Sequence, residues 1–261
     1  MNKLLGYIFT PIHYLFFGLF LCMFHPVQWV SLRFGGLEAH KRSVDLMNFF
    51  LVGTYFIMGS RISFSNPQKL PENQPIIFVA NHQSMYDIPP LIWFLRKHYP
   101  KFISKIELTK GIPSISFNLK NGGGANIDRK DSKQAVAEIL ILGGKMKEYN
   151  WSSVIFPEGT RSRDGKLKPF AVGGIATLLK RCPNALIVPV AIQGSWKFVQ
   201  FGKFPLSFGE KMSWTVLKPI ENSGISLEEI VKMTEEAIKG ELEVESGKWR
   251  VKLASQINSE F

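Results

Sequence analysis

Two apolar runs dominate the first 60 residues of the chain. No Asp, Glu, Lys or Arg occurs from Leu4 to Leu32, a run longer than the roughly 18 apolar residues that suggest a membrane span. A second uncharged run, Leu46 to Ser60, is short for a full crossing. Together the runs predict a pair of helices that enter or lie in a bilayer, although the second run could instead form a helix of the protein core.

A signal peptide is the main alternative for the first run, because Lys3 could form a short basic region ahead of it. The run is longer than the apolar part of an ordinary signal peptide, and no Ala-x-Ala-like cleavage site closes it. Basic residues flank both runs on every side: Lys3, Arg33, Lys41, Arg42 and Arg61. The positive-inside rule therefore gives no orientation, which fits a helical hairpin in one leaflet about as well as a true span.

The pattern changes after about residue 65, where prolines at 67, 71 and 75 form a linker-like passage. We place a domain boundary there, with membrane-associating helices over 1–65 and a second domain over 66–261. Short β-branched apolar runs then alternate with longer helical patterns. They predict strands at 75–80, 101–104, 125–128, 152–157 and 185–192, and helices near 88–98, 131–148 and 171–182. This alternation predicts an α/β fold with a largely parallel sheet flanked by helices.

The carboxyl-terminal part of the chain, from residue 213 on, carries two further elements. The segment SWTVLKPI, at 213–220, predicts a late strand, and a helix with a solvated charged face follows it. Ser226 with Glu229 three residues later is the pattern of a helix cap, so we expect this helix to begin there.

Charge and cysteine content narrow the class of protein. A net charge of +11 and a pI near 9.6 imply acidic partners, which could be nucleic acid, an anionic membrane surface or a phosphorylated substrate. The two cysteines, Cys22 and Cys182, are too few and too far apart in the sequence to suggest a disulfide framework. The simplest interpretation is a catalytic domain in a reducing compartment, facing the cytoplasm.

Polar side chains gather directly after the predicted strands. In open α/β sheets, ligands bind beyond the carboxyl ends of the strands, so these residues are the first candidates for a site. They are Asn81, His82 and Asp87 after the first strand, Lys105 and Glu107 after the second, Asp128 and Arg129 after the third, and Glu158, Gly159, Thr160, Arg161 and Ser162 after the fourth.

His82 and Asp87 stand five positions apart, which on an α-helix is about 500° of rotation and puts them on different faces. Pro89 and the proline after it lack N–H donors and fit only the first turn of a helix, which makes Asp87 the expected N-cap. A rival placement has Ser84 as the cap, but Pro89 would then lie where the helix needs the N–H donor that proline lacks. In both placements His82 lies in a loop, from which its ring can meet the carboxylate.

A histidine oriented by a carboxylate is the general-base half of a catalytic triad. The alternative is that Asp87 only caps a helix and His82 is an ordinary loop residue. The chain contains no G-x-S-x-G nucleophile elbow, no H-E-x-x-H or paired Cys/His zinc pattern, and no complete glycine-rich phosphate loop. A base without a protein nucleophile suggests that the substrate brings its own hydroxyl.

The segment FPEGTRSRDG, at 156–165, is the second candidate. Arg161 and Arg129 could clamp a phosphate through bidentate hydrogen bonds, and Lys105 could add a point charge. Gly159 would permit close approach of a ligand, and Glu158 could hold an arginine or a glycerol hydroxyl. A surface turn with an ion pair is the alternative, and the His/Asp pair on the same sheet edge favours a site.

Four ordered blocks of the chain resemble those of the glycerophospholipid acyltransferases. NHQSMYD (81–87) is similar to the family's N-H-x-x-x-x-D block, and FPEGTRS (156–162) to its F-P-E-G-T-R-S block. GGANIDR (123–129) is similar to the G-x-x-F-I-x-R block, and IVPVAI (187–192) to a fourth block that contains proline. The resemblance covers roughly residues 65 to 220 and is strongest to the bacterial 1-acyl-sn-glycerol-3-phosphate acyltransferases.

The resemblance implies transfer of a fatty acyl group from acyl-CoA or acyl-carrier protein to the sn-2 hydroxyl of lysophosphatidate, which gives phosphatidate. Family members carry a two-helix amino-terminal element that docks in the membrane, and the two apolar runs resemble it. We therefore expect the membrane lipid bilayer as a partner, at the inner membrane, with the catalytic domain facing the cytoplasm. We expect no cofactor, no metal ion and no nucleic acid.

Carried over to this sequence, the resemblance assigns His82 as the base and Asp87 as the residue that orients its ring. It assigns binding of the glycerol phosphate to Arg129, Glu158, Gly159, Thr160 and Arg161, and a part in shaping the pocket to Pro189. Asn126 departs from the family pattern, because an aromatic residue usually stands there. The acceptor could therefore differ: glycerol 3-phosphate, another lysophospholipid or a lyso-aminolipid would need the same base and thioester.

Attack on a thioester develops negative charge on the carbonyl oxygen, and the backbone N–H groups at the entrance of the helix after His82 are our candidates to stabilise it. Direct transfer follows from the missing nucleophile, and Cys182 is the one residue that could contradict it. A rival from another class is a membrane-docked basic module that binds lipid or nucleic acid. Its best evidence is the basic and aromatic segment RKHYPKFISK, at 96–105.

Overall fold

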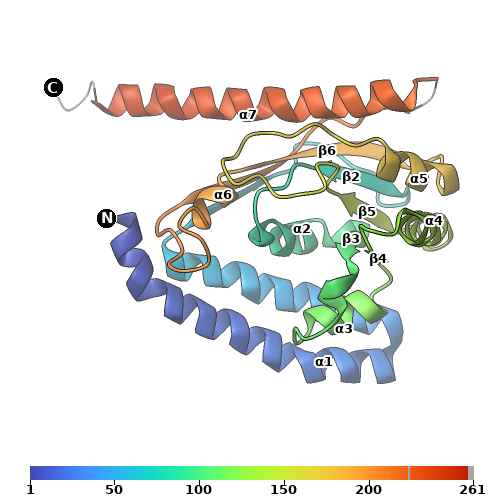
Figure 1. Cartoon of the computed structure of the whole chain (residues 1–261), viewed down its shortest axis with the longest axis horizontal. Coiled ribbons are helices and arrows are strands. Elements are labelled where there is room, and N and C mark those ends of the chain that lie inside the picture. The colour runs from blue at the N-terminus through green and yellow to red at the C-terminus, as the bar shows by residue number, and fades with distance from the viewer. Residues whose placement is uncertain (223, 258–261) are drawn as a thin grey trace.

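One sheet of seven strands runs through the part of the protein that the computed structural model describes, residues 1–222 and 224–257 (Figure 1). In their order across the sheet, the strands are β1 (Arg61–Ser65), β7 (Lys211–Val216), β6 (Leu186–Gln193), β2 (Ile76–Ala80), β5 (Ser152–Ile155), β3 (Pro100–Lys105) and β4 (Ala125–Ile127). Neighbouring strands are parallel except β6 and β7. The predicted α/β fold with a largely parallel sheet is confirmed, and every predicted strand is present.

Helices cover both faces of the sheet (Figure 1). The side chains of β2 alternate between two cores, with Ile76, Phe78 and Ala80 in one and Ile77 and Val79 in the other. The helices of the first core are α1 (Asn2–Gly53) and α2 (Ile88–Phe94), and those of the second are α4 (Ser132–Tyr149), α5 (Gly173–Arg181) and α7 (Leu227–Ile257). A strand buried on both faces has no polar alternation, which explains the continuous apolar run that predicted β2.

The amino-terminal helix α1 bends back on itself at Gly36, whose φ of 68° and ψ of −165° are not helical. The two arms lie side by side (Figure 1): the rings of Phe20 and Phe50 stack 5.0 Å apart, and Gln28 Nε2 lies 3.4 Å from Met47 Sδ. A short 3-10 helix, η1 (Thr54–Met58), continues the second arm. The predicted pair of helices is therefore present as a helical hairpin.

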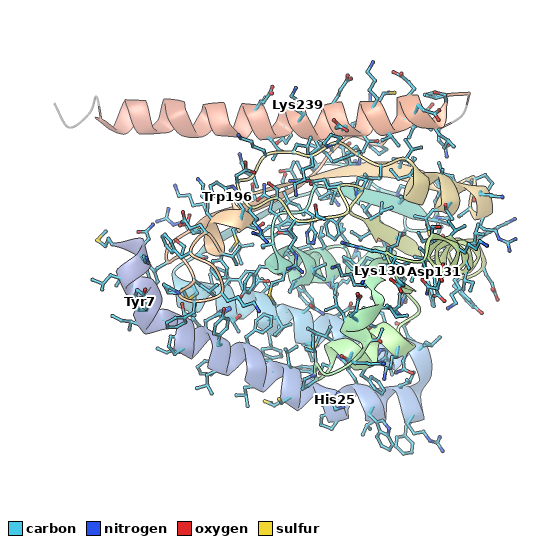
Figure 2. All side chains as sticks on the ribbon, viewed as in Figure 1. Tyr7, His25, Lys130, Asp131, Trp196 and Lys239 are labelled. Atoms are coloured by element: carbon cyan, nitrogen blue, oxygen red, sulfur yellow. The ribbon has the colours of Figure 1, made fainter. Side chains whose placement is uncertain are left out.

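The two sides of this hairpin differ in their surroundings. On the inner side, Phe17, Leu21 and Phe24 are buried in the same core as the sheet. The outer side exposes a row of apolar residues on the first arm: Ile8, Ile12, Leu15, Leu19, Met23, Val27, Val30 and Phe34. Figure 2 shows this arm, with Tyr7 and His25 labelled, across the molecule from Lys239 of α7. The helix is also long and apolar enough to cross a membrane.

Several short elements were not predicted from the sequence: β1, the seven-residue helix α3 (Ile115–Asn121) and the four-residue helix α6 (Ser195–Phe198). Because β1 pairs with β7, the last five residues of the predicted amino-terminal segment belong to the sheet. The alternation of Ile62 and Phe64 was the available signal for this strand. The cap of the last helix is confirmed, since Glu229 N–H donates to Ser226 Oγ at 3.2 Å.

Candidate active site

Five neighbouring parallel strands, in the order β6-β2-β5-β3-β4, end at the same edge of the sheet. His82 follows β2 and Glu158 follows β5, so the loops that carry them are direct neighbours. Lys105 ends β3, and Arg129 lies two residues beyond β4. The predicted polar residues therefore occupy one edge of the sheet, as expected for a ligand site.

His82 and Asp87 form a direct pair. His82 Nδ1 lies 2.8 Å from Asp87 Oδ2, which also accepts the N–H groups of Gln83 at 2.7 Å and Ser84 at 2.9 Å. The Asp87 side chain is completely buried, and that of His82 is 12% exposed. A carboxylate held by this many donors keeps the proton of the neutral ring on Nδ1. The lone pair of Nε2 is then available to take a proton from a substrate.

α2 begins at Ile88 with Asp87 at its N-cap position, as expected, but the Asp87 side chain makes no cap hydrogen bond to this helix. The side-chain cap belongs to Ser84, which precedes a separate turn: its Oγ accepts Tyr86 N–H at 3.1 Å, and Asp87 completes the capping box as the third residue. The chain first makes a 3-10 turn, η2 (Met85–Asp87), and α2 begins only afterwards with prolines in its first turn. The missing N–H of Pro89 therefore costs no helix hydrogen bond, because this proline still lies in the first turn of a helix.

The hypothesis that backbone N–H groups at this helix entrance stabilise the oxyanion is wrong for three of them. Those of Gln83 and Ser84 donate to the Asp87 carboxylate, and that of Tyr86 donates to Ser84 Oγ. A donor already engaged inside the turn cannot also meet a developing negative charge at the substrate. These groups hold the pair in place instead.

Glu158 connects the loop after β5 to the loop that carries the base. Its Oε1 accepts His82 N–H at 2.7 Å, its Oε2 accepts Lys168 N–H at 3.2 Å, and Ser162 N–H donates to His82 O at 2.7 Å. Burial raises the pKa of Glu158 to about 7, although the two backbone hydrogen bonds oppose this shift. The carboxylate thus joins two loops at the edge of the sheet.

Two residues of the FPEGTRS block contact the ring of His82 itself. Phe156 stacks on it, with ring centroids 4.1 Å apart and planes 19° apart. Arg161 Nε–H donates to His82 Nε2 at 3.4 Å on the exposed side of the ring, so a substrate hydroxyl would replace this long contact. Lys168, which sequence reasoning missed, donates from Nζ to Thr160 Oγ1 at 3.0 Å and to Arg161 O at 2.9 Å. Gly159, with a φ of +67°, makes the turn between strand and loop.

The structure does not bring every candidate to His82. Lys105 and Arg129 are exposed, and within residues 1–222 and 224–257 neither side chain forms a hydrogen bond or ion pair. Three strand spacings separate β4 from β2, which is about 14 Å. Pro189 lies inside β6 opposite Val79, where β7 has ended and Leu217 N–H donates to the Pro189 carbonyl. The side chains of Lys105 and Arg129 are therefore free to contact a ligand along the edge.

Asn126, the departure from the family pattern, lies in β4 and faces α3. Its Nδ2 donates to Leu119 O at 2.6 Å, and its backbone carbonyl accepts Gln134 Nε2 at 2.9 Å. The amide thus makes a polar contact between β4 and α3, at the position where the family usually has an aromatic side chain. This contact lies three residues before Arg129 and helps to set where the chain leaves the strand.

Sequence reasoning missed one buried neighbour of the pair. Ser195 follows the end of β6, and its hydroxyl donates to Asp87 Oδ1. The only local signal was a Gly-Ser step directly after a predicted strand.

Cys182 lies between α5 and β6, at the opposite end of the strands from His82. Burial raises the pKa of its thiol, so this position does not supply a nucleophile to the site. No group of three His, Cys, Asp or Glu side chains that could hold a metal ion occurs among the described residues.

Comparison with known proteins gives one consistent result. An acyltransferase family model matches residues 61–193. Human 1-acyl-sn-glycerol-3-phosphate acyltransferase beta is 28% identical over 199 residues, covering 76% of this chain and 69% of that protein. The coconut (Cocos nucifera) 1-acyl-sn-glycerol-3-phosphate acyltransferase is 29% identical over 171 residues, 65% of this chain and 51% of that protein. The chain therefore spans two thirds of the first relative and about half of the second.

The crystal structure of the 1-acyl-sn-glycerophosphate acyltransferase PlsC from Thermotoga maritima has a similar fold. The TM-score is 0.77 with 24% sequence identity, over 94% of this chain and 98% of that one. The shared fold thus includes the amino-terminal hairpin as well as the sheet.

The raised pKa of Glu158 predicts a pH-dependent loss of stability. The folded protein holds this proton up to a pH of about 7, whereas the unfolded chain releases it near 4.5. The free energy of unfolding should therefore fall as the pH rises from 4.5 to 7. In Glu158→Gln this part of the slope should be absent in thermal melts across that range. Glu236→Gln, on the exposed side of α7, is the control and should keep the wild-type slope. A wild-type slope in Glu158→Gln would contradict the prediction.

Proposed function

The chain belongs to the acyltransferase family, and we propose that it moves a fatty acyl group from a thioester to the sn-2 hydroxyl of lysophosphatidate, giving phosphatidate. The names of its relatives support this acceptor. The observation that carries the proposal is the buried Asp87 carboxylate against Nδ1 of His82, which leaves Nε2 as a base at the sheet edge.

In the proposed reaction, His82 Nε2 takes the proton of the sn-2 hydroxyl while that oxygen attacks the thioester carbonyl. Asp87 stabilises the imidazolium that forms and keeps the ring in place. The tetrahedral intermediate then collapses, the C–S bond breaks, and the imidazolium returns the proton to the leaving thiolate. No acyl-enzyme is needed, because the acceptor provides the nucleophile.

The phosphate of the acceptor would bind to the basic side chains along the edge. Arg161 lies beside the base. The side chains of Lys105 and Arg129 form no hydrogen bond with any other described residue. Guanidinium groups bind phosphate oxygens in pairs, which orients the glycerol as well as holding it. Gly159, Thr160 and the carboxylate of Glu158 would complete this wall of the site.

The bilayer would supply the acceptor and receive the product. The exposed apolar row on the first arm of α1 suits insertion among lipid chains, while the inner side packs on the catalytic core. We infer that the hairpin docks at the inner membrane with the site facing the cytoplasm. Acyl-CoA or acyl-carrier protein would deliver the thioester from that side.

The rival interpretation, a basic binding module, loses its main support in the structure. In the segment 96–105, Arg96 stacks over Trp93 at 4.0 Å and Lys101 over Trp151 at 4.2 Å. Tyr99 likewise faces Lys41 at 4.4 Å. Each of these three half-buried side chains is already paired with a residue outside the segment, so together they do not form an open stacking platform for bases.

His82→Ala should lower the rate of acyl transfer by about 10³-fold, because it removes the general base. Binding of lysophosphatidate should stay close to wild type. The measurement is thiol release from acyl-CoA and from acyl-carrier protein in detergent, with lysophosphatidate, glycerol 3-phosphate and a lyso-aminolipid as acceptors. His98→Phe is the control, because this buried ring packs on Phe78 far from the site. Full activity of His82→Ala would contradict the mechanism.

Arg161→Ala should raise the KM for lysophosphatidate by about tenfold or more, which is the loss of one charge-assisted contact to phosphate. Monoacylglycerol, which has no phosphate, should be used equally badly by the wild type and the variant. Arg163→Ala is the matched control, since it removes an exposed arginine from the same loop. Equal KM values for the two variants would show that Arg161 does not bind the phosphate.

A double change, Leu15→Glu with Leu19→Glu, should weaken binding to phospholipid vesicles by roughly a hundredfold or more, because each charge is costly inside a bilayer. Co-sedimentation with vesicles measures this. Val136→Glu with Ile141→Glu adds the same charge to exposed apolar positions of α4 and should leave binding unchanged. Wild-type binding by the α1 variant would mean that this arm does not enter the membrane.

A further inference from the structure

The Asp87 carboxylate is held on both of its oxygens. Oδ2 accepts His82 Nδ1–H and two backbone N–H groups, as described above. Oδ1 accepts a hydrogen bond from the Ser195 hydroxyl and another, at 3.3 Å, from Ser84 Oγ. Ser195 is completely buried, and it comes from a strand end 108 residues further along the chain. Among the described residues, Oδ1 is therefore held by these two hydroxyls, and the one from Ser195 comes from a different strand.

Two features at the end of β6 position the Ser195 hydroxyl. Asn81, directly before the base, pairs with the backbone of Ile192 in both directions, at 2.8 and 2.7 Å. Gly194 then turns the chain with a φ of +82°, and a Cβ there would stand 2.0 Å from the Lys211 carbonyl oxygen. Only glycine fits such a turn, which puts Ser195 at the start of α6, facing the neighbouring loop.

A second contact fixes the register of the same turn. Gln83, the residue after the base, accepts Trp196 N–H at 3.4 Å and lies 3.3 Å from Ser195 Oγ. The hydroxyl has one proton, and the Asp87 oxygen is the nearer and the charged acceptor, so the proton points at the carboxylate.

We propose that Ser195 is a positioning residue of acyl transfer, whose hydroxyl fixes the rotation of the Asp87 carboxylate so that Oδ2 faces Nδ1 of His82. The inference rests on the proposed function, because it deepens the role of the same pair. A carboxylate turns about its Cβ–Cγ bond, and a donor on Oδ1 restricts this rotation. Without it, the buried anion keeps only the long Ser84 contact on that side, and the orientation of the His82 ring is fixed less tightly, by the donors on Oδ2 alone.

The kinetic test compares Ser195→Ala with Ser195→Thr, which keeps the hydroxyl. Ser195→Ala should lower kcat about tenfold, the effect of losing one hydrogen bond to a charged group, while KM for both substrates stays within error. Ser195→Thr should recover most of the rate. Rates are normalised to folded protein from thermal melts, so that lost stability does not count as lost turnover.

Ser207→Ala is the matched control. Ser207 is also completely buried in the segment after β6, and its hydroxyl donates to a carboxylate, Glu210, at 2.6 Å. That carboxylate lies outside the site, so this variant should lose stability only. A wild-type kcat in Ser195→Ala, or the same loss of kcat in Ser195→Ala and Ser207→Ala, would overturn the proposal.

A spectroscopic readout separates this proposal from the proposed function. The chain has five histidines, and the downfield Nδ1 proton of His82 is assigned by its absence in His82→Ala. In Ser195→Ala this signal should move or broaden, whether or not turnover is measured. An unchanged signal would overturn the role of Ser195 alone. A wild-type protein that transfers no acyl group would instead overturn the proposed function and leave the signal test valid.

Discussion

The hydrogen bond between His82 Nδ1 and Asp87 Oδ2 imposes the constraint on which the site depends. Residues five positions apart cannot share a face of a helix, so the chain between them must turn back. It does so through a single 3-10 turn capped by Ser84, after which two prolines start α2. The buried carboxylate is then satisfied by backbone and side-chain donors together, and the ring that it orients presents Nε2 at the end of the sheet.

The surrounding fold holds this turn from three directions. Glu158 joins it to the loop after β5, and the turn after β6 reaches Asp87 from the other neighbouring strand. The amino-terminal hairpin holds it as well: His13 of α1 has its Nε2 3.3 Å from Tyr86 Oη, and Tyr55 of η1, which continues the second arm, donates from Oη to Tyr86 O at 3.1 Å. The residue next to Asp87 is thus packed against both arms of the element that we place in the membrane. The element that we propose to dock in the membrane therefore also supports the turn that carries His82 and Asp87.

Much of this could be predicted from local sequence. The strands were found because β-branched apolar runs end at polar residues, and the sheet edge followed from the rule for parallel strands. The position of Asp87 before α2 was predicted correctly, but the side-chain cap of Ser84 was rejected because the rule on proline was applied to a single helix, whereas the chain makes a separate turn first. Ser195 could not be found in this way, since its contact depends on β6 lying beside β2, which no local pattern encodes. The five residues of β1 and the seven of α3 were too short for a clear period.

The central claim is a direct transfer, in which the acceptor hydroxyl attacks the thioester and the protein never carries the acyl group. The most direct measurement is the amount of thiol released and phosphatidate formed in one reaction, with the mass of the protein followed in parallel. The account predicts one thiol per phosphatidate, no thiol release without lysophosphatidate, and an unchanged protein mass with donor alone. Thiol release without acceptor, or a protein heavier by one acyl group, would contradict it.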